Sequence, residues 1–156
     1  MLAAVALRGD EQLVGPGLRY RAEEVPMSYK LSERSLNNLA ECHPDLQKIA
    51  HELIKEMDVL IVDGHRGEKE QNDAFRRGTS KLRYPNSKHN KKPALAFDAV
   101  PFVKGAPGGI DWSARARFLA MREHFKLTAA RLGIQLRFIS WDLPHIELAN
   151  SEIAKK

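Results

Sequence analysis

The sequence has very little cysteine and no long apolar run. Its 156 residues contain a single cysteine, Cys42, which excludes an internal disulfide framework and a cysteine-based zinc site. No apolar stretch approaches the roughly 18 to 20 residues that a membrane-spanning helix needs. The sequence also lacks internal repeats and low-complexity tracts. We therefore expect one soluble domain, in which any metal site must use histidine, aspartate or glutamate.

The charge of the chain is moderately positive. It has 25 Lys and Arg against 20 Asp and Glu, a formal net charge of +5. Such a surplus suits an anionic partner, whether nucleic acid, a membrane surface or an acidic cell-wall polymer. The basic residues are spread over several segments and are not interleaved with aromatic residues, as they are on single-strand-binding surfaces. We expect no nucleic-acid partner, although a noncatalytic basic module that binds cell wall or nucleic acid stays open as an alternative.

The two ends of the chain differ in character from its middle. Residues 1–26 have poor apolar periodicity and a GPG break, which predicts a flexible N-terminal extension. Their apolar opening is short and no positive residue precedes it, so we expect no signal peptide and synthesis in the cytoplasm. Met27 begins a more regular sequence and is a candidate natural start. We expect a globular domain over residues 27–150 and a C-terminal tail over 151–156.

Apolar spacing in the domain predicts helices mixed with short strands. Ser32 and Pro44 are suited to helix starts, and Gly78 and Gly133 to helix ends. There is no βαβ repeat and the connections are short, which indicates an α+β fold with an antiparallel sheet. We expect helices at 32–40, 43–57, 67–78 and 111–132, and strands at 58–64, 94–102 and 134–141.

Three segments place polar residues at strand ends, where the pattern predicts burial: VDGHRGEKEQ, SKHNKKPALAFD and SWDLPHIEL. Asp98 lies within an apolar run, where an unpaired charge is costly, so we expect a positive partner for it. Two histidines and one carboxylate suit a catalytic zinc, which takes about three protein ligands and leaves one position for water. We therefore predict that His89, Asp98 and His145 bind Zn²⁺. From spacing alone, a plain loop role for His89 and a turn-capping role for Asp98 stay open.

Three further residues are candidates for the chemistry. Asp142, three residues before His145, is placed to accept a proton from attacking water and to pass it to a leaving amine. Glu147 is an alternative base, although strand alternation favours a structural role for it. Arg66 is a candidate to hold a substrate carboxylate or to stabilise a developing oxyanion with its fork of donors. A solvated turn residue is the alternative interpretation of Arg66.

Taken together, these segments resemble a known family. SERSLNNLAECHPDLQKIA, GHRGEKEQ, SKHNKKPALAFDAVPF and WDLPHIEL resemble, in this order, segments of phage endolysins of the zinc-dependent L-alanyl-D-glutamate peptidase group, which are related to D-alanyl-D-alanine carboxypeptidases. The resemblance covers residues 28–148. It implies a small zinc peptidase of the D-Ala-D-Ala carboxypeptidase/hedgehog-like type, with helices packed on a short, mostly antiparallel sheet. It also implies hydrolysis of the L-Ala–D-Glu bond of peptidoglycan during phage or prophage host lysis.

The resemblance also implies roles for individual residues. It supports the three zinc ligands proposed above and makes Asp142 the catalytic carboxylate. Arg66 matches the arginine of the family's G-x-R motif, which implies a role in catalysis and substrate binding. Ser87 matches the serine of S-x-H, and Gln71 matches the glutamine downstream of the arginine. Both are therefore expected at the substrate site, whereas its position alone allows Gln71 to be a helix-surface residue.

The sequence departs from the family pattern in two places. The spacer between His89 and Asp98 is longer than the commoner family spacing, and the path from Gly133 to Asp142 is shorter than in many relatives. The second departure bears on the scissile bond, so a D-Ala-D-Ala carboxypeptidase or dipeptidase acting on cell-wall precursors stays open as an alternative. The implied partners are bacterial peptidoglycan and a membrane pore-forming protein that releases the enzyme. A monomer is the default expectation.

Overall fold

A computed structural model describes residues 29–149 together with two short strands, β1 (Glu11–Leu13) and β2 (Arg19–Arg21). These two strands pair in antiparallel fashion. The rest of the expected N-terminal extension, the candidate start Met27 and the expected C-terminal tail lie outside the described residues. Within the described part of the chain, no helix is both long enough and apolar enough to cross a membrane.

The helices begin and end close to the predicted positions. The side chain of Ser32 accepts a hydrogen bond from the backbone N–H of Ser35, and Pro44 occupies the first turn of the next helix. Gly78 and Gly133 end their helices with φ values of 83° and 73°, in the left-handed region that favours glycine. The helical elements are α1 (Glu33–Leu39), α2 (Pro44–Leu53), α3 (Glu68–Arg77), α4 (Arg115–Leu132) and the short 3-10 turns η2 (Lys88–Asn90) and η3 (Pro107–Gly109).

Two helix boundaries differ from the prediction. Helix α2 ends at Leu53, because residues 54–56 form a turn. Helix α4 begins only at Arg115. The carboxylate of Asp111 accepts hydrogen bonds from the backbone N–H and the hydroxyl of Ser113, at 3.0 and 2.7 Å, and holds a turn in front of the helix. Trp112, which falls within the predicted helix, therefore lies outside α4 and is 63% exposed.

One sheet of four antiparallel strands organises the domain. Its order is β3-β4-β6-β5, with β3 (Val59–Asp63), β4 (Ala96–Pro101), β5 (Leu136–Phe138) and β6 (His145–Leu148). Strand β5 is shorter than expected, and β6 was not among the predicted strands. Pro144 directly precedes β6, where its missing N–H does not interrupt the pairing.

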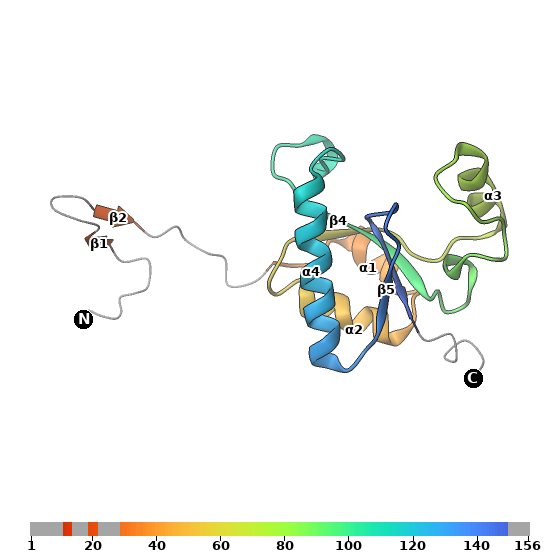
Figure 1. The fold of residues 1–156 in the computed structure, drawn as a ribbon, viewed down its shortest axis with the longest axis horizontal. Coiled ribbons are helices and arrows are strands. Elements are labelled where there is room, and N and C mark those ends of the chain that lie inside the picture. Colours follow the sequence, from red (N-terminus) through yellow and green to blue (C-terminus); the bar gives the residue numbers. More distant parts are fainter. Residues whose placement is uncertain (1–10, 14–18, 22–28, 150–156) are drawn as a thin grey trace.

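The core lies between this sheet and three of the helices. Helix α1 packs against β3, and α4 packs against both α2 and β4. Phe97 of β4 and Phe125 of α4 are fully buried and their rings lie 5.8 Å apart. Figure 1 shows α4 crossing the sheet, with α3 standing apart beyond the opposite side of the domain. The predicted α+β fold is confirmed, and α3 is left free to form one wall of a groove.

Candidate metal centre

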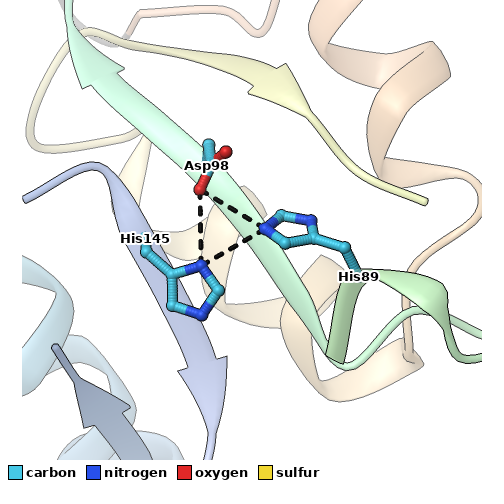
Figure 2. A group of neighbouring side chains, drawn as sticks. All are labelled: His89, Asp98 and His145. Carbon is cyan, nitrogen blue, oxygen red and sulfur yellow. Dashed lines mark hydrogen bonds and ion pairs between the residues drawn. The ribbon is translucent and has the colours of Figure 1, made fainter. Parts of the chain in front are cut away.

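The structure brings together the three residues predicted to bind metal. His89 lies on η2, Asp98 in β4 and His145 at the start of β6, and the register of β4 and β6 pairs Asp98 directly with His145. Asp98 Oδ1 is 3.5 Å from His89 Nε2 and 3.5 Å from His145 Nδ1, and the two nitrogens are 3.2 Å apart (Figure 2). One ligand atom of each residue lies within 4.8 Å of the others, as a metal site requires.

Backbone and side-chain acceptors determine which ring nitrogens face this centre. His89 Nδ1 is 2.8 Å from the carbonyl oxygen of Gly64, and His145 Nε2 is 2.8 Å from Oε1 of Glu147. Because both partners are acceptors, these nitrogens carry hydrogens, and the opposite nitrogens, which face Asp98, are the ones that can bind a metal after losing their protons. Asp98 Oδ1 is buried and accepts no hydrogen bond within the described part of the chain. A cation at this point would satisfy all three donor atoms, so the residues fit a metal.

The electrostatics of the centre favour positive charge. Burial by itself would lower the pKa of His145, but the neighbouring carboxylates of Asp98 and Glu147 raise it to about 9. Burial would raise the pKa of Asp98, but the charge of His89 and the interactions with both rings hold it far below its ordinary value. A carboxylate that stays ionised beside two imidazoles suits a divalent cation, which replaces the proton at the centre.

A short turn holds His89 in place. The hydroxyl of Ser87 accepts a hydrogen bond from the backbone N–H of His89 at 3.1 Å, and Asn90 Oδ1 accepts one from the Ser87 N–H at 2.9 Å. The backbone N–H of Arg66 donates to the His89 carbonyl oxygen at 2.8 Å. Ser87 is 4% exposed. Its position beneath the ligand turn orients His89, although it also borders the groove.

Arg66 contacts the second oxygen of Asp98. Its Nη2 lies 3.2 Å from Asp98 Oδ2, while Nε donates to Asp63 Oδ2 at 2.9 Å and Nη1 to Gln71 Oε1 at 3.0 Å. Gln71 is fully buried, and its amide donates to Ser80 Oγ at 2.9 Å. Arg66 therefore occupies Oδ2 of Asp98 and leaves Oδ1 to face the histidines. Gln71, expected at the substrate site, lies behind Arg66 and fixes its orientation.

Glu147 lies on the outer side of His145, away from Asp98. It is 3% exposed and accepts hydrogen bonds from His145 and from Nη1 of Arg137 at 2.7 Å, with Lys88 Nζ at 3.4 Å. Burial would raise the pKa of Glu147, but the hydrogen bonds from His145 and Arg137 lower it to about 2. A carboxylate held ionised by these partners is a poor proton acceptor, so its placement supports the structural role that strand alternation favoured.

Asp142 lies in the connection between β5 and β6 and borders the same groove, which has a volume of about 1340 Å³. Helix α4 anchors this connection, because Nη2 of Arg122 donates to the Ile139 carbonyl oxygen at 2.8 Å. Partial burial raises the pKa of Asp142, and the negative charge of Asp98 adds to the shift. A carboxyl group with a raised pKa is better matched to proton transfer near neutral pH than an ordinary aspartate.

Sequence reasoning missed part of the support around these residues. Asp63 is the last residue of β3 and binds Arg66. The sequence signal for this contact is an acidic residue three positions before the arginine. Gly64 supplies the carbonyl oxygen that contacts His89 Nδ1, and a pattern of side chains in the sequence does not reveal such a backbone contact. The long spacer after His89 is accommodated by exposed residues, Lys91 and Lys92, which do not line the groove.

Comparisons with known proteins relate the chain to L-Ala–D-Glu peptidases. The family model described as phage L-alanyl-D-glutamate peptidase matches residues 27–150. The chain is 35% identical over 115 residues to the L-alanyl-D-glutamate peptidase of Escherichia phage T5. The aligned residues make up 72% of this chain and 80% of that protein. The fold is similar to the crystal structure of the Serratia marcescens L-Ala D-Glu endopeptidase ChiX, with a TM-score of 0.64 and 22% identity over 78% of this chain and 91% of that one.

Proposed function

The chain belongs to the phage L-alanyl-D-glutamate peptidase family, and we propose that it hydrolyses the amide bond between L-Ala and D-Glu in the peptide stem of bacterial peptidoglycan. One observation carries the metallopeptidase assignment. Two imidazole nitrogens converge with Oδ1 of Asp98, which accepts no hydrogen bond from the residues that the structure describes, at the wall of a groove that Asp142 also borders. This is a set of metal ligands with a proton-transfer group in the same groove.

The proposed metal is Zn²⁺, held by His89, Asp98 and His145. This donor set of two imidazoles and one carboxylate is typical of catalytic zinc, and the single cysteine, Cys42, does not belong to the cluster of ligand atoms. When bound, Zn²⁺ supplies Lewis-acid chemistry, which makes water nucleophilic near neutral pH and polarises a carbonyl group.

Asp142 is the proposed proton-transfer residue. Its carboxylate accepts a proton from the attacking water as the new C–O bond forms at the L-Ala carbonyl carbon. It then donates that proton to the nitrogen of D-Glu as the C–N bond breaks, which leaves a free carboxylate on L-Ala and a free amine on D-Glu. The raised pKa of Asp142 supports both steps, because the group must gain and lose the proton within one turnover.

We propose that Arg66, Gln71 and Ser87 act mainly by positioning. Arg66 holds Asp98 Oδ2, and Gln71 holds Arg66. Ser87 holds the turn that carries His89. Arg66 also borders the groove. Those of its guanidinium N–H groups that do not bind Asp63, Gln71 or Asp98 are available to a substrate carboxylate or to the negative charge that develops on the scissile carbonyl.

The biological setting belongs to the same proposal. We infer a role in phage or prophage host lysis, in which the protein is made in the host cytoplasm and acts on peptidoglycan as a monomer. Passage to the wall would then depend on a membrane pore-forming partner. The net charge of +5 favours association with an anionic cell-wall polymer.

Digestion of defined muropeptides tests the proposed bond. The zinc-loaded full chain is incubated with a glycan-linked stem peptide, and the products are identified by mass spectrometry. We expect a peptide that begins with D-Glu and a sugar that retains L-Ala. Release of free D-Ala would instead identify a carboxypeptidase. An undigested substrate, together with a protein that takes up no Zn²⁺ when the ion is supplied, would support a noncatalytic wall-binding module.

A further inference from the structure

Both tryptophans of the chain line the groove. Trp141 directly precedes Asp142, and Trp112 lies in the turn before α4. Trp112 is 63% exposed and Trp141 is 49% exposed. Burial of a large aromatic side chain removes more apolar surface from water than burial of most other side chains, and so contributes more free energy. Two half-exposed indole rings in one groove therefore indicate a ligand that covers them. The catalytic residues proposed above do not use either ring.

Each ring is held by a neighbour. Trp112 stacks on Phe118 of α4, with ring centroids 6.1 Å apart and an angle of 21° between the planes. The ammonium group of Lys81 lies 4.5 Å from the centroid of the Trp141 ring, and Lys81 comes from the segment after α3. Figure 1 places α3 at one edge of the domain and β5 nearer its middle, so the contact of Lys81 with Trp141 joins two segments that both line the groove. Rings held in this way lose little entropy when a ligand binds.

The substrate chemistry identifies a ligand for these rings. In peptidoglycan the stem peptide is attached through its L-Ala to the lactyl group of a muramic acid sugar, so one residue and one lactyl group separate the L-Ala–D-Glu bond from the sugar ring. Two such extended units span about 7 Å. A groove that holds this bond beside Asp142 therefore brings the sugar within reach of neighbouring residues of the same groove, which include Trp141. Pyranose rings present a face of C–H groups that packs on indole.

We propose that Trp112 and Trp141 form a glycan subsite, which binds the N-acetylated sugar next to the stem peptide. This inference rests on the proposed function, and it adds that the enzyme recognises stems attached to glycan in preference to free peptides. The subsite explains how a chain with a short connection before Asp142 orients its substrate: aromatic stacking positions the sugar, and the sugar positions the bond.

Intrinsic fluorescence tests the subsite without catalysis, because the chain contains only these two tryptophans. The probe is the peptide-free disaccharide N-acetylglucosaminyl-N-acetylmuramic acid, with sucrose as the control sugar. Trp112→Phe and Trp141→Phe each leave one reporter. We expect a saturable change in emission for both single-tryptophan proteins. An emission that responds no more to the disaccharide than to sucrose would overturn the proposal.

Kinetics give a second test. The ratio of kcat/KM for a glycan-linked stem to kcat/KM for the free stem peptide is expected to fall roughly 3- to 10-fold in Trp141→Ala and in Trp112→Ala. Leu127→Ala, which removes an exposed side chain of α4 outside the groove, should keep the wild-type ratio. Equal losses on both substrates would refute the subsite. A wild-type protein that cleaves neither substrate would refute the proposed function, and the fluorescence titration would still decide the subsite.

Discussion

Oε1 of Glu147 lies 2.8 Å from Nε2 of His145, on the edge of the ring opposite to the one that faces Asp98. Such a contact holds the ring orientation and makes the other nitrogen a better metal ligand. We expect Glu147→Gln to lower the affinity for Zn²⁺ about 10- to 100-fold, measured by competition with a chromophoric chelator. Glu123→Gln, which removes an exposed carboxylate that pairs with Lys126, is the matched control. Equal affinities in the two variants would contradict this role.

Asp142→Asn tests the proton-transfer step. The amide keeps the size of the side chain but cannot accept the proton, so kcat is expected to fall roughly 100- to 10,000-fold. Zinc content should stay at one ion per chain, because Asp142 is not a proposed ligand. Turbidity of purified cell walls and metal analysis of the same sample provide the two measurements. Lysis at an undiminished rate would show that another group moves the proton.

Removal of the metal is expected to abolish hydrolysis and to lower Tm. A ligand that binds only the folded state stabilises it by about 2.7 kcal/mol at a concentration 100 times its Kd. Thermal unfolding with a chelator, and again after addition of Zn²⁺, measures this difference. Mg²⁺ prefers oxygen ligands and should restore neither activity nor Tm. Full activity in excess chelator would rule out the metallopeptidase mechanism.

Gly64→Ala probes the backbone that orients His89. A Cβ atom at Gly64 would lie 2.3 Å from the carbonyl oxygen of Asn38, so the backbone must shift. We expect a loss of about 1–3 kcal/mol in the free energy of unfolding of the metal-free protein, from urea denaturation. Zinc affinity should fall as well, because the Gly64 carbonyl oxygen holds His89 Nδ1. In the control Gly67→Ala, the new Cβ meets only a movable side-chain oxygen of Glu70 at 2.9 Å, and zinc affinity should not change.

We expect the buried thiol of Cys42 to lower the free energy of unfolding at alkaline pH. Burial, together with the charges of Glu41 and Asp63, raises the pKa of the thiol from 9.0 to about 12. Because the folded state keeps the thiol protonated, its contribution is complete below pH 9 and is lost between pH 9 and 12, by up to about 1.4 kcal/mol per pH unit. Chemical denaturation of the metal-free protein at several pH values should show a shallower decline in Cys42→Ala. Parallel declines would mean that the thiol does not carry this effect.

Much of the local structure was readable from the sequence. Ser32, Pro44 and the two helix-ending glycines act through their own backbone and nearest neighbours, so their effects do not depend on the rest of the fold. The element types in the domain followed from apolar periodicity for the same reason. Asp98 also stood out within the sequence, because a charge in an apolar strand requires a partner wherever that strand lies.

The tertiary structure alone decided how the site is assembled. Pairing of β4 with β6 joins Asp98 to His145 across a long separation in the chain, and β6 was not predicted because it has only four residues and follows a proline. The direction of each imidazole depends on a particular acceptor: the carbonyl oxygen of Gly64, just after β3, for His89, and the carboxylate of Glu147, in the same strand, for His145. The sequence therefore determined which residues are candidates for the chemistry, since that depends on residue type. Only the fold determined which atom of each residue faces the centre, because contacts between distant segments, such as those of His89 with Gly64 and of Asp98 with Arg66, orient them.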